Sequence, residues 1–341
     1  MLYRYILKIY SLTKEKGVKF CLEIWGTDYA KIKDACVLAE DLGYHGFFYG
    51  ESLADLDLDC WTVISALSSL TKRIKLGPVI TYLLPQYRSI ALITKQAITL
   101  HDISDGRLEF RTGAGATLQY AVQWWYPYGI DYPENGKRVL MFEEGIRILK
   151  MLLGDNPSSS ISPLFSLPSS VKFNGEFFRI NGVTFKRPSK KIPITVAAKK
   201  NKMMHLAAKY GDIWESSYLS PQQFSSLRSS FERISQSVNN DGKGNYNKKI
   251  ANSIELDVLI AENDRDLEYK KRMFAMERSP AVFNQILNNG LVGKPDVISK
   301  KVKKYTDAGV NQFFLAFQNP FDFKALELFR ESVKGSCGGG E

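Results

Sequence analysis

A glutamate that follows a short apolar segment has clear potential for acid–base chemistry in this sequence. Glu51 comes directly after residues 45–50, which read HGFFYG. A carboxyl group held where water is partly excluded has a raised pKa and can exchange protons near neutral pH. We therefore interpret Glu51 as the candidate general acid or base. The alternative is a structural carboxylate that accepts hydrogen bonds from loop backbone.

Two loops contain residue types that suit a planar or anionic ligand. The first is a Gly-Ala-Gly turn at 113–115, where a ring or phosphate can approach the backbone because glycine has no Cβ atom. It is not the dinucleotide motif GxGxxG, because position 118 is leucine. The second loop places two lysines, which could equally be solvated, before a predicted helix whose first amides attract anions. The residues expected to contact a cofactor in these loops are Gly113, Ala114, Gly115, Ala198, Lys199, Lys200 and Asn201.

Histidine and cysteine are too few and too dispersed to predict a metal site. The three histidines stand at positions 45, 101 and 205, and the four cysteines at 21, 36, 60 and 337, without a CxxC pair. We therefore expect no metal ion and no disulfide framework, and a reducing cytoplasm as the compartment.

The chain is basic, with 46 Lys and Arg against 36 Asp and Glu, a net charge of +10. A basic chain invites a nucleic-acid hypothesis. The positive residues are scattered, however, and runs such as KKVKK at 300–304 are typical of solvated helix faces. We expect a small-molecule substrate and no specific nucleic-acid partner, and the general positive field favours anionic ligands.

Short apolar segments alternate with amphipathic patterns along most of the chain. Residues 18–25 predict a strand, and apolar residues at 29, 32, 36 and 39 recur with the spacing of a helix. Further strands are predicted at 45–50, 74–81, 107–113, 192–198, 212–217, 252–261 and 310–317. Helices are predicted at 58–70, 89–103, 137–153, 202–210, 221–237, within 264–289, and at 295–308 and 322–334. Eight β/α units favour a closed (β/α)8 TIM barrel, whose active site lies at the C-terminal ends of the strands.

Three stretches fall outside this alternation. Residues 1–17 are interpreted as an N-terminal extension and 335–341 as a flexible tail, so the barrel domain spans 18–334. Residues 154–191 are interpreted as an insertion after strand four. Within it, an Asn-Gly pair between alternating apolar residues at 171–180 predicts a hairpin. No run approaches the ~20 apolar residues of a membrane span, so no membrane partner is expected.

An ordered series of segments resembles the luciferase-like monooxygenase family, and within it the branch that uses the deazaflavin coenzyme F-420. The segments are GYHGFFYGE at 43–51, DGRLEFRTGAG at 105–115, FEEGIRIL at 142–149, FNGEFF at 173–178, IPITVAA at 192–198, LAAKYGD at 206–212, GKPDV at 293–297 and DAGV at 307–310. The helix that begins KMMHLA at 202–207 is similar in style to that of methylene-tetrahydromethanopterin reductases.

This resemblance implies a flavin-type ring across the strand tips and commonly a homodimer. It also implies a non-proline cis peptide bond between Val79 and Ile80, and a coenzyme phosphate at the two loops described above. In the second of these loops, the chain has lysines where the family usually has small residues. This difference changes the loop, but the added positive charge favours an anionic tail. Sugar-phosphate dehydrogenases of this branch have His and Glu where Ser52 and Ala116 stand, so we do not expect their reaction.

Three hypotheses of function follow. The leading one is reversible hydride transfer between the deazaflavin C5 carbon and a small organic substrate, with Glu51 assisting proton movement. In this hypothesis Thr81 and Gln119 contact the ring and the tail. The alternative is an FMN-dependent monooxygenase, in which reduced flavin activates oxygen. The third is a non-catalytic barrel that binds flavin or polyanions with salt-sensitive affinity and without turnover.

Overall fold

The structure is a computed structural model that describes residues 17–53, 57–116, 118–154, 170–184, 186–241 and 249–334. The sequence-based extension lies almost wholly outside these residues, and the C-terminal tail lies outside them entirely. So does the Ser- and Pro-rich part of the insertion, at 155–169.

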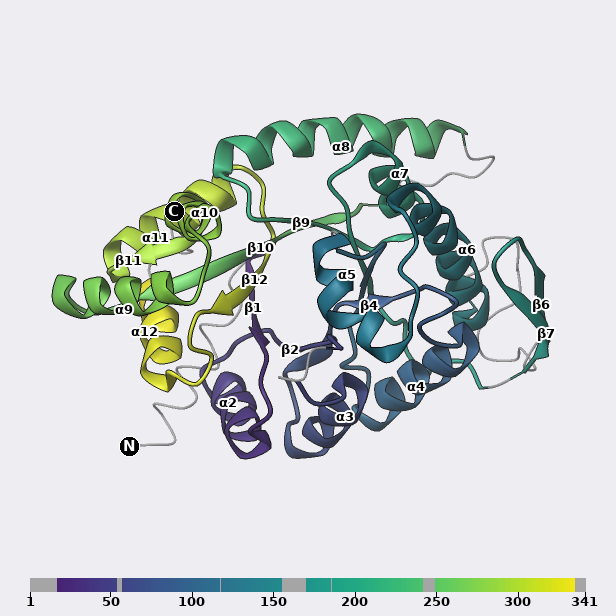
Figure 1. Cartoon of the computed structure of the whole chain (residues 1–341), viewed down its shortest axis with the longest axis horizontal. Coiled ribbons are helices and arrows are strands. Elements are labelled where there is room, and N and C mark those ends of the chain that lie inside the picture. Colours follow the sequence, from purple (N-terminus) through teal and green to yellow (C-terminus); the bar gives the residue numbers. More distant parts are fainter. Residues whose placement is uncertain are drawn as a thin grey trace.

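Parallel strands form a barrel in the described part of the chain (Figure 1). Their order of pairing is β3-β2-β1-β12-β10-β9-β8-β5-β4. The two ends of this order are halves of one strand that Ile80 joins, so the sheet closes on itself. The strands are β1 (Lys19–Ile24), β2 (Gly46–Gly50), β3 (Lys75–Val79), β4 (Thr81–Tyr82), β5 (Phe110–Gly113), β8 (Ile194–Ala197), β9 (Ile213–Ser217), β10 (Ala251–Ile260) and β12 (Gln312–Phe317). This arrangement confirms the predicted (β/α)8 barrel.

Helices alternate with the strands and cover the outside of the barrel. They are α2 (Tyr29–Asp41), α3 (Cys60–Leu70), α4 (Ile90–Ile103), α6 (Asn135–Leu153), α7 (Asn201–Tyr210), α8 (Pro221–Asp241), α9 (Asp264–Met276), α10 (Pro280–Asn289), α11 (Pro295–Asp307) and α12 (Phe323–Val333). Side-chain caps set several of their starts: Asp59, for example, accepts a hydrogen bond from the Thr62 amide at 2.8 Å. Among the described residues, no helix is both long and apolar enough to cross a bilayer.

Three short elements were not predicted from the sequence. They are α5 (Leu118–Trp124) and the 3-10 helix η1 (Tyr126–Tyr128), both between β5 and α6, and the strand β11 (Leu291–Gly293) beside β10. Each has too few residues to repeat a hydrophobic pattern several times, as longer elements do.

The predicted hairpin is present as an antiparallel pair of strands, β6 (Val171–Asn174) and β7 (Arg179–Val183). It projects from the side of the barrel near α6 (Figure 1). The carboxylate of Glu144, on α6, accepts hydrogen bonds from the amides of Glu176, Phe177 and Phe178 at 2.8–3.1 Å. The Glu144 carboxylate therefore helps to fix the turn of the hairpin to the barrel, together with the packing of Phe178 in the main core.

Alternation along the strands separates an apolar outer face from a polar inner face. Phe47 and Tyr49 belong to the main core under the helices, whereas Phe48 between them packs inside the barrel against Cys21 and Phe314. Several other inward positions hold buried polar and charged side chains, which are Glu23, Glu109, Arg111, Thr195, Glu215, Ser253 and Gln312. The inside of the barrel therefore combines a small apolar cluster with buried polar and charged groups.

Candidate functional site

Small residues end the inward series of several strands at the C-terminal end of the barrel. Their positions follow from the alternation that places Phe48, Arg111 and Phe314 inside. The small residues are Gly50, Gly113, Ala197, Ser217 and Ala316. A Cβ atom built on Gly113 would lie 2.9 Å from Ile80 Cδ1 and 3.4 Å from Ala197 Cβ. The Trp25 side chain fills the space beside Gly50, where a Cβ atom would collide with it. We call the ends of these strands the floor of the barrel mouth, and Ile80 and Trp25 border it.

The junction between β3 and β4 borders this floor. The Val79–Ile80 peptide bond is cis, as the resemblance implies. Its neighbours hold it to the adjacent strands, because the amide of Glu51 donates to Val79 O at 2.7 Å and Thr112 Oγ1 donates to Thr81 O at 2.7 Å. The segment 79–81 is thus fixed between β2 and β5.

Glu51 lies buried behind this junction, with 3% of its surface exposed. Thr81 Oγ1, on β4, and Trp61 Nε1, on α3 at 3.2 Å, both donate to its Oε2 atom. Its Oε1 atom accepts a hydrogen bond from Tyr87 Oη at 3.1 Å and lies 3.2 Å from Arg88 Nε. Glu51 is therefore more enclosed than the strand-end position alone suggested, and it has no direct opening to the floor.

Burial raises the pKa of the Glu51 carboxyl group, and the Arg88 guanidinium opposes this shift. Only two of the four partners, the hydroxyl groups of Thr81 and Tyr87, are able to accept a proton, because indole and guanidinium groups only donate. Tyr87 is half-buried and packs on Trp125 at 4.8 Å between ring centroids. Among the described partners of Glu51, the Thr81 and Tyr87 hydroxyl groups are therefore the two that could relay a proton.

A second buried acidic group surrounds Arg111 inside the barrel. Arg111 donates to both carboxylate oxygens of Glu215 at 2.9 Å and to Glu23 Oε1 at 2.5 Å, and its guanidinium lies 3.6 Å from the Phe314 ring centroid. Glu255 Oε2 lies 3.7 Å from Arg111 Nη2. One cation therefore faces three carboxylates, of which Glu23 and Glu215 are fully buried and Glu255 is partly exposed.

This imbalance favours protonation of the group. Burial raises the pKa of Glu215 to about 7, and burial together with the Glu255 charge raises the pKa of Glu23 well above its usual range. Glu23 Oε2 is buried and has no hydrogen-bond partner among the described residues. Glu23 ends the inward series of β1 and pairs in register with Ala316, so it lies next to the floor. Glu23 therefore places a buried oxygen without a described partner beside the mouth.

Polar side chains from β9, β10 and the end of β12 line the same end of the barrel. Tyr218 has a left-handed backbone, with φ of 57°, and donates its hydroxyl proton to Glu255. Gln318 Nε2 donates to Asp257 at 2.6 Å, and burial raises the pKa of Asp257 to about 7. The Lys199 ammonium lies 5.9 Å from the Tyr218 ring centroid.

The two candidate cofactor loops have different surroundings. Arg138 Nε donates to Ala114 O at 3.0 Å and supports the Gly113–Gly115 turn from behind. Gly115 has φ of +94°, a conformation that glycine adopts readily. In the second loop, Ala198 is buried while Lys199 and Lys200 are exposed, and α7 begins at Asn201 without a side-chain cap.

The structure brings some of the sequence-based site residues together and separates others. Ile80, Gly113 and the end of β8 meet at the floor, with Val79 and the Lys199–Asn201 loop beside it. Thr81 is fully buried and bonded to Glu51. Gln119 lies on α5, and its side chain is outside the described residues.

Sequence reasoning missed Glu23, Arg111 and Glu215. A signal was present, since each is a charged residue at an inward position of a buried strand. Trp61, Tyr87 and Arg88 were missed as well, because their contact with Glu51 depends on how α3 and the loop before α4 pack.

Known proteins resemble this chain over most of its length. The model of the luciferase-like monooxygenase family matches residues 13–312. The 5,10-methylenetetrahydromethanopterin reductase of Archaeoglobus fulgidus is 27% identical over 58% of this chain and 51% of its own, so the match spans about half of that relative. The F-420-dependent glucose-6-phosphate dehydrogenase of Segniliparus rotundus is 23% identical over 79% of this chain and 81% of its own.

A solved structure agrees with the fold. An F-420-dependent secondary alcohol dehydrogenase in complex with an F-420-acetone adduct has a TM-score of 0.76 at 18% identity, covering 93% of this chain and 99% of that chain. The barrel described above and the match over residues 13–312 lead to one conclusion. The chain belongs to the luciferase-like monooxygenase family.

Proposed function

We propose that this protein is a coenzyme F-420-dependent oxidoreductase that transfers hydride to or from a small organic substrate. The observation that carries the proposal is the floor of small residues next to buried carboxylic acids at the mouth of the barrel. Two relatives support the proposal: one is named a 5,10-methylenetetrahydromethanopterin reductase, and the other an F-420-dependent glucose-6-phosphate dehydrogenase. The Ser52 and Ala116 positions argue against a sugar-phosphate substrate.

The residues present fit a flat ring with an anionic tail. Val79, Ile80 and Gly113 would border the ring, because the inward series ends there without large side chains. Ala114 and Gly115 would approach the tail beside Gln119. Lys199, Lys200 and the uncapped amides at Asn201 would hold its phosphate, with Ala198 as the buried base of that loop. The coenzyme, when bound, supplies hydride chemistry at its C5 carbon.

The protein would supply position and protons. Glu23 can hold a proton on its free Oε2 atom at the edge of the floor. Glu51 can hold another and pass it through Thr81 or Tyr87. Both groups are buried, so the protons that they hold would be shielded from exchange with bulk water.

The finer assignments also remain our proposals. We propose a cytoplasmic homodimer without a specific nucleic-acid or membrane partner, in line with the family resemblance and the scattered positive charge. Sedimentation at two protein concentrations tests the dimer, and a monomer at both would contradict it.

Oxygen chemistry distinguishes this function from the FMN-dependent alternative. Protein mixed with reduced F-420 in aerated buffer is expected to leave dissolved oxygen unchanged. Protein mixed with reduced FMN is expected to produce no more peroxide than free FMN does. A protein-dependent oxygenated product or excess peroxide with FMN would overturn the proposal in favour of a monooxygenase.

A further inference from the structure

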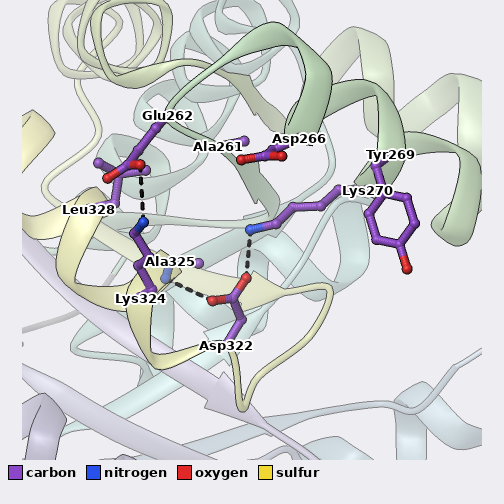
Figure 2. Close-up of a pocket in the computed structure, with 9 residues that line it drawn as sticks. All are labelled: Ala261, Glu262, Asp266, Tyr269, Lys270, Asp322, Lys324, Ala325 and Leu328. Atoms are coloured by element: carbon purple, nitrogen blue, oxygen red, sulfur yellow. Dashed lines mark hydrogen bonds and ion pairs between the residues drawn. The ribbon is translucent and has the colours of Figure 1, made fainter.

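A cavity of about 500 Å³ lies between α9, the end of β10 and the loop that leads into α12. A neighbouring cavity of about 240 Å³ shares Tyr269, Lys270, Asp322 and Ala325 with it. We call the two together the α9 cavity, and Figure 2 shows the smaller part. Its size falls in the range of small-molecule sites.

The α9 cavity reaches the mouth of the barrel at Gln318. This side chain lines the larger cavity, and its Nε2 atom donates to Asp257 at 2.6 Å. Asp257 follows Glu255 on the inward series of β10, and Glu255 lies beside Arg111. A molecule that reacts at the floor could therefore extend past Gln318 into the α9 cavity.

One wall of this cavity is apolar. Tyr269 and Met273 stand one helical turn apart on α9, with 58% and 44% of their surfaces exposed, and Phe274 lies between Met273 and the β10 end. Phe317 and Pro320 line the opposite side. Exposed large apolar side chains around a hollow are covered favourably by an apolar ligand.

The charged groups around the cavity are mostly acidic, although the chain is basic. The lining residues include two lysines and four acids, which are Lys270, Lys324, Glu262, Asp266, Glu277 and Asp322. Both ammonium groups are already paired, since Lys270 Nζ lies 2.5 Å from Asp322 and Lys324 Nζ lies 3.0 Å from Glu262 (Figure 2). Asp266 and Glu277 form no ion pair among the described residues.

One further cation lies close to the cavity. The Arg278 guanidinium stands 5.0 Å from the Phe274 ring centroid, and its charge partly opposes the rise in the pKa of Asp257 that burial causes. The four lining acids still exceed the three cations, which are Lys270, Lys324 and Arg278. An anionic ligand would meet a repulsive field here and find no free lysine.

We propose that the α9 cavity binds the non-reacting part of the substrate and selects a neutral or cationic molecule with an apolar body. That the bound molecule is a substrate rests on the proposed function, whereas its binding in the α9 cavity does not. The apolar body would cover Tyr269, Met273 and Phe274, and a hydrogen-bond donor or ammonium group would face Glu277. Phosphate and carboxylate groups are excluded from this end of the site.

Three probes of one skeleton test the proposal: 4-phenylbutylamine, 4-phenylbutan-1-ol and 4-phenylbutyrate. The full chain is labelled with ¹³C on its methionine methyl groups, and the Met273 signal is assigned with Met273→Leu. Met276, which is 81% exposed and does not line the cavity, is the internal control. We expect the amine and the alcohol to shift the Met273 signal. The carboxylate should bind at least roughly fivefold more weakly than either of them.

Variants that remove one negative charge test whether Glu277 causes the preference for the amine. Glu277→Gln is expected to reduce the preference for the amine over the carboxylate at least about twofold. Glu331→Gln is the matched control: it makes the same charge change on α12, at a residue that does not line the cavity, and should leave the preference unchanged. Equal or tighter binding of the carboxylate, or no shift of Met273 with any probe, would overturn the proposal. The probes need no coenzyme, so a failure here is distinguishable from a failure to bind F-420.

Discussion

Replacing Arg111 by methionine removes the cation that holds Glu23, Glu215 and Glu255 together. The side chain is fully buried and makes three hydrogen bonds of 2.5–2.9 Å to two of these carboxylates. Methionine fills a similar volume without a charge. Breaking a buried ion pair by removing one partner costs about 3–5 kcal/mol, because the other charge stays buried. We expect Arg111→Met to lower the free energy of unfolding by this amount at pH 8.

The loss should depend on pH in a defined direction. The pKa of Glu215 is about 7 in the folded protein, and the pKa of Glu23 is raised as well. The folded state therefore binds protons that the unfolded chain releases, and wild-type stability falls as pH rises from about 4.3 to about 7. Without Arg111 both pKa values rise further. At pH 5.5 the carboxyls are protonated and uncharged, so the loss should shrink by at least about 1 kcal/mol.

Urea unfolding followed by circular dichroism at pH 5.5 and pH 8 measures both losses. Arg107→Met is the matched control, because Arg107 is 7% exposed and its guanidinium bonds to backbone carbonyls of Ser68, Thr71 and Ile74 instead of carboxylates. Its loss should be similar at the two pH values. If Arg111→Met lost the same stability at both, or under about 1 kcal/mol at pH 8, the account of the barrel interior would be refuted.

Four further outcomes are expected at the mouth, three from variants and one from the wild-type protein. Glu51→Gln should lower turnover by about a hundredfold or more while the coenzyme dissociation constant changes less than about threefold, as steady-state kinetics and fluorescence titration would show. Because the pKa of Glu51 is raised, wild-type turnover that needs its proton should fall as pH rises through that pKa, and a rate indifferent to pH would count against this role. Gly113→Val should weaken coenzyme binding about tenfold or more, since the added atoms would meet Ile80, and unchanged affinity would exclude Gly113 from the ring site. Lys200→Glu should weaken F-420 binding several-fold and flatten its salt dependence, whereas an effect on riboflavin-sized ligands without phosphate would contradict a phosphate contact.

Elements with a full hydrophobic period were predictable from the sequence. The strand at 19–24 and the helix at 29–41 lie within two residues of their expected bounds, because each has several turns or alternations of pattern. The elements α5, η1 and β11 are too short to show a period. The hairpin at 171–183 was found from one Asn-Gly pair, since turn chemistry is local.

The site was less predictable than the fold. Glu51 was identified because strand ends carry function in barrels, but its enclosure by Trp61, Tyr87 and Arg88 depends on packing between distant segments. The Arg111 group brings together residues 88 and 104 positions apart in the chain. No local pattern specifies such a pair, although the parity of charged residues along each strand would have pointed to the barrel interior.

Binding of the coenzyme itself tests the central claim most directly. Purified protein is titrated with F-420 and, separately, with FMN, each oxidised and reduced, and fluorescence is followed at equilibrium. The proposed function predicts that F-420 binds at least about tenfold more tightly than FMN, and that Gly113→Val removes this difference in affinity. Tighter binding of FMN would move the protein to the monooxygenase function, and binding of neither cofactor would contradict the proposed activity.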